Sequence, residues 1–168
     1  MQSEPSSAST RVKGIPDNSS IIMPRLVCRD VALEIDFCVK TFGAAILNRR
    51  PGPGGKDAHA LLSIRDEMLM IEAEWLQVPS RAPAMDGSSP VPIFIYVPDV
   101  DQTVERGIEL GAKVLVPAQN QFWGDRTGWI LDPSGHVWTI ASRIEETTGA
   151  ERSDRWAKML SAQQKSEP

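Results

Sequence analysis

The sequence predicts an α+β fold in which two tandem modules, each a strand, a helix and three further strands, form a cup-shaped, mostly antiparallel sheet with outer helices. Two observations favour this fold. An apolar strand, an Asp, a helical stretch and a Gly-Ala pair occur in this order twice, offset by 69 residues at the Asp and 68 at the Gly. Such self-similarity is typical of a duplicated module. The 168 residues also include 13 Pro and 12 Gly, and so many turn formers favour short strands.

The first copy starts at residues 26–30, where an apolar strand ends at Asp30, a residue type suited to the helix N-cap. The helix that follows is expected to end at Gly43, because glycine readily adopts the left-handed C-cap conformation. A strand at residues 45–50 and a hairpin that turns near residues 65–67 complete the module.

The second copy repeats this order from residue 93, with Asp99 as the expected N-cap. Val100, Val104 and Ile108 then form an apolar stripe of period four, which predicts the buried side of a helix. The module ends in a hairpin around Asp-Pro-Ser-Gly at residues 132–135, a sequence that favours a type I turn followed by a left-handed glycine.

The chain is therefore divided into four parts. Residues 1–19 are read as a flexible tail, 20–90 as the first module with a linker, 91–146 as the second module, and 147–168 as a C-terminal tail with a possible helix.

Charge and composition limit the partners. The chain carries 18 basic and 22 acidic residues, a net charge of -4, and no basic cluster of the kind that nucleic-acid binding requires. It has no secretory signal and no apolar run long enough to span a bilayer, so we expect a cytoplasmic protein without a membrane partner. The two cysteines are expected to stay reduced.

Strand alternation assigns the side chains of the first hairpin to two faces. Pairing across a two-residue turn gives one face that is wholly apolar and expected beneath the helix. The other face mixes methionines, a histidine and carboxylates, which is typical of a semi-enclosed ligand pocket. Its members are His59, Leu61, Ser63, Met68, Met70, Glu72 and Glu74. In the second hairpin the same argument puts Trp129, Leu131, Val137, Thr139 and Ala141 on one face, opposite Ile130, Trp138 and Ile140.

His59 lies opposite Glu72 in this pairing, which allows either a metal or acid–base role or a simple hydrogen bond at the rim. We weigh the hydrogen bond more heavily, because one His and one Glu are fewer than the three protein ligands of a typical catalytic metal. His136 follows a turn and is expected to brace it or to face solvent.

The segment Gln-Phe-Trp-Gly-Asp-Arg, residues 121–126, also offers two interpretations. Asp125 and Arg126 could brace the loop while Phe122 and Trp123 fill the junction between the modules, or the aromatic residues could close the mouth of a pocket.

These two motifs, Gln-Phe-Trp-Gly-Asp-Arg and Asp-Pro-Ser-Gly-His-Val-Trp at residues 132–138, together with the order of elements, closely resemble the vicinal oxygen chelate superfamily. Within it, the chain looks like the PhnB-like branch of the glyoxalase/bleomycin-resistance proteins. The resemblance covers about residues 20–145. It implies paired modules, a cup-shaped site and a homodimer.

Enzymes of this superfamily hold a divalent metal with ligands on the first and last strand of each module. The resemblance maps those four positions onto Met23, Glu72, Pro92 and Thr139, of which only Glu72 ligates metals well. We therefore expect no cofactor. The alternative is an unconventional Zn, Ni, Mn or Fe site built from Glu72 and His59.

Three functions remain open. In the first, the protein encloses a small, partly hydrophobic or aromatic molecule without metal, between walls of Met68, Met70, Trp129 and Leu131, with Glu74, Thr139, Phe122 and Trp123 as further ligand contacts. In the second, it is a metal-dependent lyase or dioxygenase with Glu72 and His59 as catalytic residues. In the third, the pocket is collapsed and the fold is an interaction module.

Overall fold

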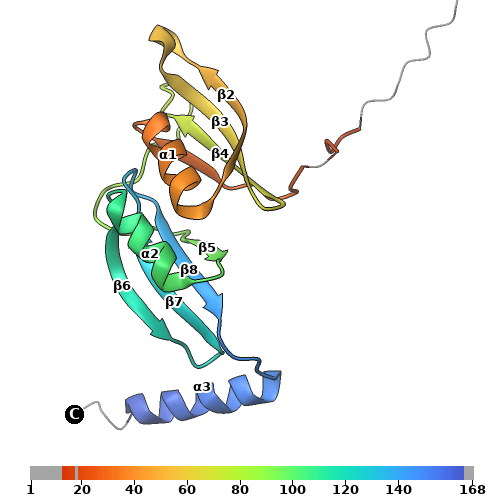
Figure 1. Cartoon of the computed structure of the whole chain (residues 1–168), viewed down its shortest axis with the longest axis vertical. Coiled ribbons are helices and arrows are strands. Elements are labelled where there is room, and N and C mark those ends of the chain that lie inside the picture. Colours follow the sequence, from red (N-terminus) through yellow and green to blue (C-terminus); the bar gives the residue numbers. More distant parts are fainter. Residues whose placement is uncertain (1–12, 18, 165–168) are drawn as a thin grey trace, which may run out of the picture.

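The computed structural model describes residues 13–17 and 19–164, so most of the predicted N-terminal tail lies outside the described residues. The first module contains β1 (Arg25–Cys28), α1 (Val31–Phe42), β2 (Ala45–Pro51), the short helix η1 (Pro53–Gly55), β3 (Asp57–Ile64) and β4 (Glu67–Ala73). The second contains β5 (Ile93–Tyr96), α2 (Val100–Glu109), β6 (Lys113–Asn120), β7 (Asp125–Leu131) and β8 (Val137–Arg143). Helix α3 (Gly149–Gln164) follows (Figure 1).

Each module contributes one four-stranded sheet, and the two sheets have the same topology. The strand orders are β1-β4-β3-β2 and β5-β8-β7-β6. In each sheet the first strand runs parallel to the last strand of its module, and the other neighbours are antiparallel. The predicted α+β fold of two tandem modules is therefore confirmed, with one mixed sheet in each module.

The predicted helix starts are confirmed at both N-caps. Asp30 accepts a hydrogen bond from the backbone N–H of Leu33 at 3.1 Å, and Asp99 accepts one from that of Gln102 at 3.0 Å. Gly43 ends α1 in the left-handed region, with φ 69°. These contacts link residues close in the chain, which is why the sequence pattern identifies them.

The predicted apolar stripe of α2 is only partly right. Val100 is 1% exposed, but Ile108 is 49% exposed. The buried positions of α2 are Val100, Thr103 and Gly107. At 3.6 residues per turn a spacing of four overshoots the turn, so two such steps rotate Ile108 away from the core, whereas steps of three and four stay on one side.

The two modules share one hydrophobic core. Helices α1 and α2 lie next to each other, each in front of its own sheet in Figure 1, and Arg106 of α2 donates to the carbonyl of Thr41 at 3.3 Å. Phe42 stacks on Trp138 with ring centroids 4.5 Å apart. Each sheet thus buries its helix-covered face, and the opposite faces lie side by side on the far side of that view.

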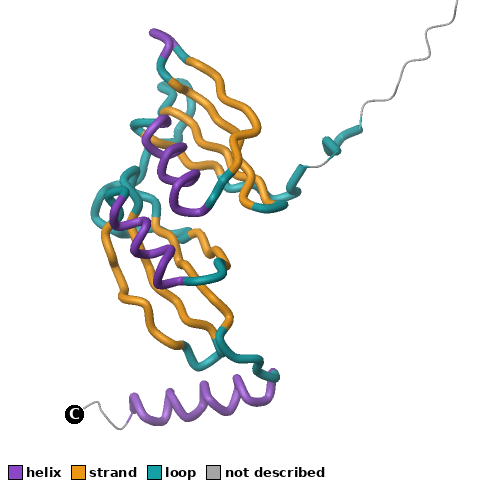
Figure 2. The backbone as a smooth tube through the Cα atoms, viewed as in Figure 1, coloured by secondary structure: helices purple, strands orange, loops and turns teal. Residues whose placement is uncertain are grey.

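A segment without helix or strand, residues 74–92, connects the modules, as the teal tube in Figure 2 shows. It packs against the turn between β7 and β8, because a Cβ added at Gly135 would meet the carbonyl of Ala84 and the sulfur of Met85 at 3.1 Å. Among the described residues, no helix is long and apolar enough to cross a membrane.

Candidate functional site

The face of each sheet that points away from its helix is called its open face below. The register of the first sheet gives its open face as Arg25, Val27, Ala45, Asn48, Arg50, His59, Leu61, Ser63, Met68, Met70 and Glu72. The register of the second gives Phe94, Tyr96, Lys113, Val116, Gln119, Asp125, Thr127, Trp129, Leu131, Val137, Thr139, Ala141 and Arg143. These faces carry most of the predicted site residues.

The predicted register of the first hairpin is confirmed. His59 pairs with Glu72 and Leu61 with Met70 across β3 and β4. The residue after β3, Arg65, has φ 54°, the left-handed conformation that a tight two-residue turn needs. On the helix-covered side, Leu62 and the other apolar residues of the hairpin lie in the core or pack against it.

Glu72 is held by two neighbours on the open face. Its Oε2 accepts a hydrogen bond of 2.6 Å from Nε of Arg25, and its Oε1 lies 3.4 Å from Nδ1 of His59. The carboxylate side chain is 17% exposed. The strand pairing predicts the contact between His59 and Glu72. It does not predict the ion pair with Arg25, because Arg25 and Glu72 are 47 residues apart in the chain.

The four expected ligand positions do not fit the usual divalent metal. Met23 and Pro92 precede β1 and β5, and Thr139 lies on β8, so Glu72 is the only carboxylate among them. Both of its oxygens already have neighbours. No group of three or more His, Cys, Asp or Glu is arranged to hold a metal ion among the described residues. A catalytic metal site normally takes about three protein ligands.

Glu74 is engaged by the segment between the modules. It lies just beyond β4, and its Oε1 accepts a hydrogen bond of 2.9 Å from the backbone N–H of Ala82. The carboxylate therefore fixes the start of this segment, whereas Met68 and Met70 stay half-buried on the open face.

The open face of the second sheet is partly covered within the chain. Leu131 and Thr139 are only 2% and 6% exposed, whereas Trp129 is 37% exposed. Phe94 and Tyr96 extend this aromatic surface onto β5, with ring centroids 5.3 Å apart and exposures of 51% and 52%. Trp138 is 2% exposed on the other side, as predicted for a core residue.

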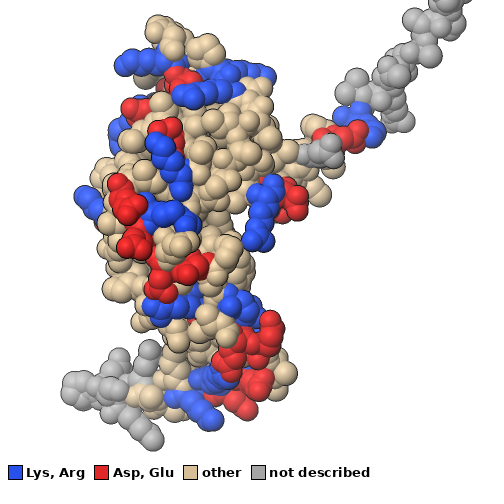
Figure 3. Space-filling view, viewed as in Figure 1, with Lys and Arg blue, Asp and Glu red and all other residues tan. Residues whose placement is uncertain are grey.

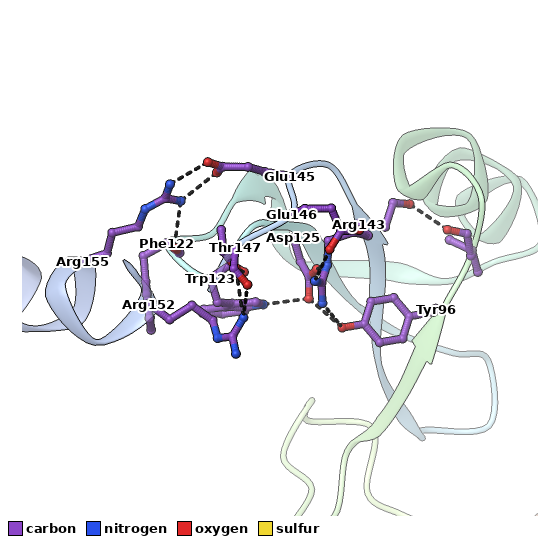
Figure 4. Close-up of polar contacts among 12 residues, drawn as sticks. Tyr96, Phe122, Trp123, Asp125, Arg143, Glu145, Glu146, Thr147, Arg152 and Arg155 are labelled. Carbon is purple, nitrogen blue, oxygen red and sulfur yellow. Dashed lines mark hydrogen bonds and ion pairs between the residues drawn. The ribbon is translucent and has the colours of Figure 1, made fainter. Parts of the chain in front are cut away.

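A buried carboxylate organises the end of this face (Figure 4). Asp125 is 1% exposed and accepts hydrogen bonds from the hydroxyl of Tyr96 and the indole of Trp123, both at 2.8 Å, and from Nε of Arg143 at 2.5 Å. Burial raises the pKa of Asp125, but the hydrogen bonds from these three donors outweigh it and hold the pKa below its usual value. The cluster is thus a fixed anchor for Arg143.

Asp125 and Arg126 do not pair with each other, and Asp125 braces the loop through its hydrogen bond from the indole of Trp123. Arg126 instead makes two hydrogen bonds of 2.8 Å to Asp101 of α2. Adjacent residues of a strand point to opposite faces, so the two side chains diverge. Phe122 contacts Trp156 of α3 with ring centroids 5.3 Å apart, so this aromatic pair lies at the α3 end of the second module and not at the junction between the modules.

A cavity of about 510 Å³ lies at the junction, between the tip of the β3–β4 hairpin and the edge strand β5. Apolar side chains such as Leu69, Ile95 and Trp138 line it, and Arg65 and Asp66 contribute charged groups. Of the predicted site residues, only Met68 lines this cavity.

Sequence reasoning missed a buried polar cluster that joins the modules. Nε2 of His136 lies 3.2 Å from the carbonyl of Val27 and 3.6 Å from the thiol of Cys28. Burial lowers the pKa of His136. Asp132 accepts from the indole of Trp138 at 2.7 Å, and the fully buried Glu34 of α1 lies close enough to Asp132 to be affected by its charge. His136 therefore bridges two modules and does not merely brace its own turn.

Comparison with known proteins identifies a protein family and a relative that match most of the chain. The family model that describes the sequences of the Glyoxalase/Bleomycin resistance protein/Dioxygenase superfamily matches residues 20–140 of this chain. Over 128 residues, 74% of this chain, the sequence is 40% identical to Uncharacterized protein Mb0911c of Mycobacterium bovis, and the match covers 84% of that relative.

Two solved structures extend the comparison. The crystal structure of TioX from Micromonospora sp. ML1 is 26% identical, with a TM-score of 0.58, and the match covers 75% of this chain and 100% of TioX. A PhnB protein from Bacillus cereus also has a TM-score of 0.58 at 14% identity, over 73% of this chain and 99% of that one. The second likeness shows the fold alone.

Proposed function

Because the chain belongs to the glyoxalase/bleomycin resistance/dioxygenase superfamily, we propose that it binds a small, partly hydrophobic or aromatic molecule without the usual divalent metal. The observation that carries this proposal is that the carboxylate of Glu72 already has partners within the chain. The only carboxylate at the four expected ligand positions is ion-paired with Arg25 and in contact with His59. Beside it, Met68, Met70 and Leu61 offer a half-buried apolar surface.

We further propose that a homodimer completes the binding site. Within one chain the two open faces lie side by side, so neither closes over the other. A second copy stacked on this side would place the first sheet of one protomer against the second sheet of its partner. The exposed rings of Phe94, Tyr96 and Trp129 support such a contact, because exposed apolar patches mark interaction surfaces.

The metal-dependent lyase or dioxygenase built on Glu72 and His59 is the weaker proposal, since a metal would have to displace Arg25 from the carboxylate. An interaction module with a collapsed pocket also has less support, because a cavity of about 510 Å³ is present at the module junction.

The remaining parts of the proposal concern the branch of the family, the kind of partner and the compartment. The two motifs at residues 121–126 and 132–138 favour the PhnB-like branch. Acidic and basic side chains interleave along much of the face drawn in Figure 3, which supports a partner other than nucleic acid. We place the protein in the cytoplasm, a reducing compartment that suits its two cysteines, which are both free and buried.

Metal addition tests the proposal. Protein purified without chelator or affinity tag is expected to contain no stoichiometric metal, and its melting temperature should not change with Zn, Ni, Mn or Fe ions. A specifically bound metal at a hundredfold excess over its Kd would stabilise the fold by about 2.7 kcal/mol, a readily measured shift. Bound metal that is lost in both His59→Ala and Glu72→Ala variants would contradict the proposal and favour the enzyme.

The dimer makes a separate prediction. Phe94→Glu places a charge on the open face and is expected to convert a dimer into a monomer in analytical ultracentrifugation, because burying an unpaired charge is costly. Ile108→Glu is a matched control, since Ile108 has similar exposure, 49%, but lies on the helix side. A wild-type chain that sediments as a monomer, or equal effects of the two variants, would refute this arrangement.

A further inference from the structure

We propose that the open face of the first sheet selects an anionic ligand, in which a carboxylate, sulfonate or phosphate group is attached to an apolar or aromatic body. The inference rests on the proposed function and names the chemical class of its ligand. Its basis is the arrangement of charge along this face, which is divided between an apolar end and a cationic end.

The register defines the two ends. Near the hairpin turn, Ser63 pairs with Met68, and Leu61 pairs with Met70 in the next row. One further step along the strands, His59 is flanked by Arg50 on β2 and Glu72 on β4. An apolar surface and a row of ionisable groups therefore adjoin on the same face, within the span of a small molecule.

The charges of that row do not cancel. Arg25 and Glu72 neutralise one another, and Glu72 also contacts His59. Arg50 is exposed, and its guanidinium has no hydrogen-bond or ion-pair partner among the residues that the structure describes. A guanidinium without a partner presents its donors in the planar arrangement that binds carboxylate and phosphate groups.

The neighbouring Arg49 provides the contrast. It lies on the opposite face of β2, opposite Ala60, and makes a bidentate ion pair with Asp57. Basic side chains gather at this end of the first module in Figure 3. Of the two adjacent arginines, only Arg50 is both on the open face and free to bind a ligand.

Two fluorescent probes with a common aromatic frame test the inference. Anilinonaphthalene sulfonate is anionic, whereas phenylnaphthylamine lacks the charged group. The wild-type chain is expected to bind both, and the sulfonate roughly tenfold more tightly, because one charge-assisted hydrogen bond contributes about that factor. Added salt should weaken the sulfonate complex alone.

The substitution Arg50→Gln is expected to weaken sulfonate binding about tenfold and leave the neutral probe unaffected, and Arg49→Gln should change neither. If Arg50→Gln and Arg49→Gln affect the sulfonate equally, or if both probes bind the wild type equally, anion selection is refuted while the proposed binding function stands. Failure of both probes to bind would overturn both proposals.

Discussion

Replacing Glu34 with Gln is expected to raise the free energy of unfolding by roughly 3 to 5 kcal/mol at pH 9 and to leave it unchanged at pH 4. Glu34 is fully buried in α1, and its Oε2 has no hydrogen-bond partner. The pKa of Glu34 is raised from 4.5 to about 8, mainly by desolvation and to a smaller extent by the charge of Asp132. The expected gain is the free-energy equivalent of that shift.

The sign follows from the proton balance. Below pH 4.5 both the folded and the unfolded chain carry the proton on Glu34, so the group does not affect stability. Between pH 4.5 and 8 only the folded chain retains it, so stability falls as the pH rises and then levels off. The amide of Gln resembles the protonated acid and should remove this dependence.

Urea unfolding at pH 4, 7 and 9, in the presence of a reductant, would measure the effect. Glu105→Gln makes the same chemical change at an exposed position of α2 and should shift stability by less than about 0.5 kcal/mol at every pH. A gain for Glu34→Gln that is the same at all three pH values would show that the carboxyl is not protonated in the folded chain.

The burial of Glu34 was not predicted from the sequence, whereas contacts between residues close in the chain were. The caps at Asp30 and Asp99 are predictable because donor and acceptor are three residues apart. The first hairpin is predictable because its strands pair across a two-residue turn. In each case the partner is fixed by local geometry, so the residue type alone carries the information.

Contacts between distant elements could not be predicted in this way. Strand alternation places Glu72 on a face, but Arg25 reaches it only because β1 lies beside β4 in the folded sheet. His136 meets Val27 at a separation of 109 residues, across the boundary between the modules. Alternation specifies the direction of a side chain and says nothing of its neighbours on another element.

The same limit applies to Asp125, whose substitution by Ala is expected to lower the free energy of unfolding by about 3 to 5 kcal/mol. The carboxylate is buried and accepts hydrogen bonds from three different segments, through Tyr96, Trp123 and Arg143. Its removal would leave those three donors without their acceptor, at a cost of about 1 to 3 kcal/mol for each donor that is buried. The side chain of Arg143 is 41% exposed, so the loss of its ion pair contributes at the lower end.

The control for this prediction is Asp101→Ala. Asp101 also makes a bidentate pair with an arginine, Arg126, but its side chain is 60% exposed, so the loss should not exceed about 1 kcal/mol. Tyr96→Phe removes a single hydrogen bond to Asp125 and should cost about 1 kcal/mol. If denaturant unfolding at pH 7 gives the same loss for Asp125→Ala and Asp101→Ala, burial adds nothing to the ion pair of Asp125 and Arg143. A large loss for Asp125→Ala alone would show that the motif at residues 121–126 is a structural anchor, which keeps Arg143 in place at the end of the second open face.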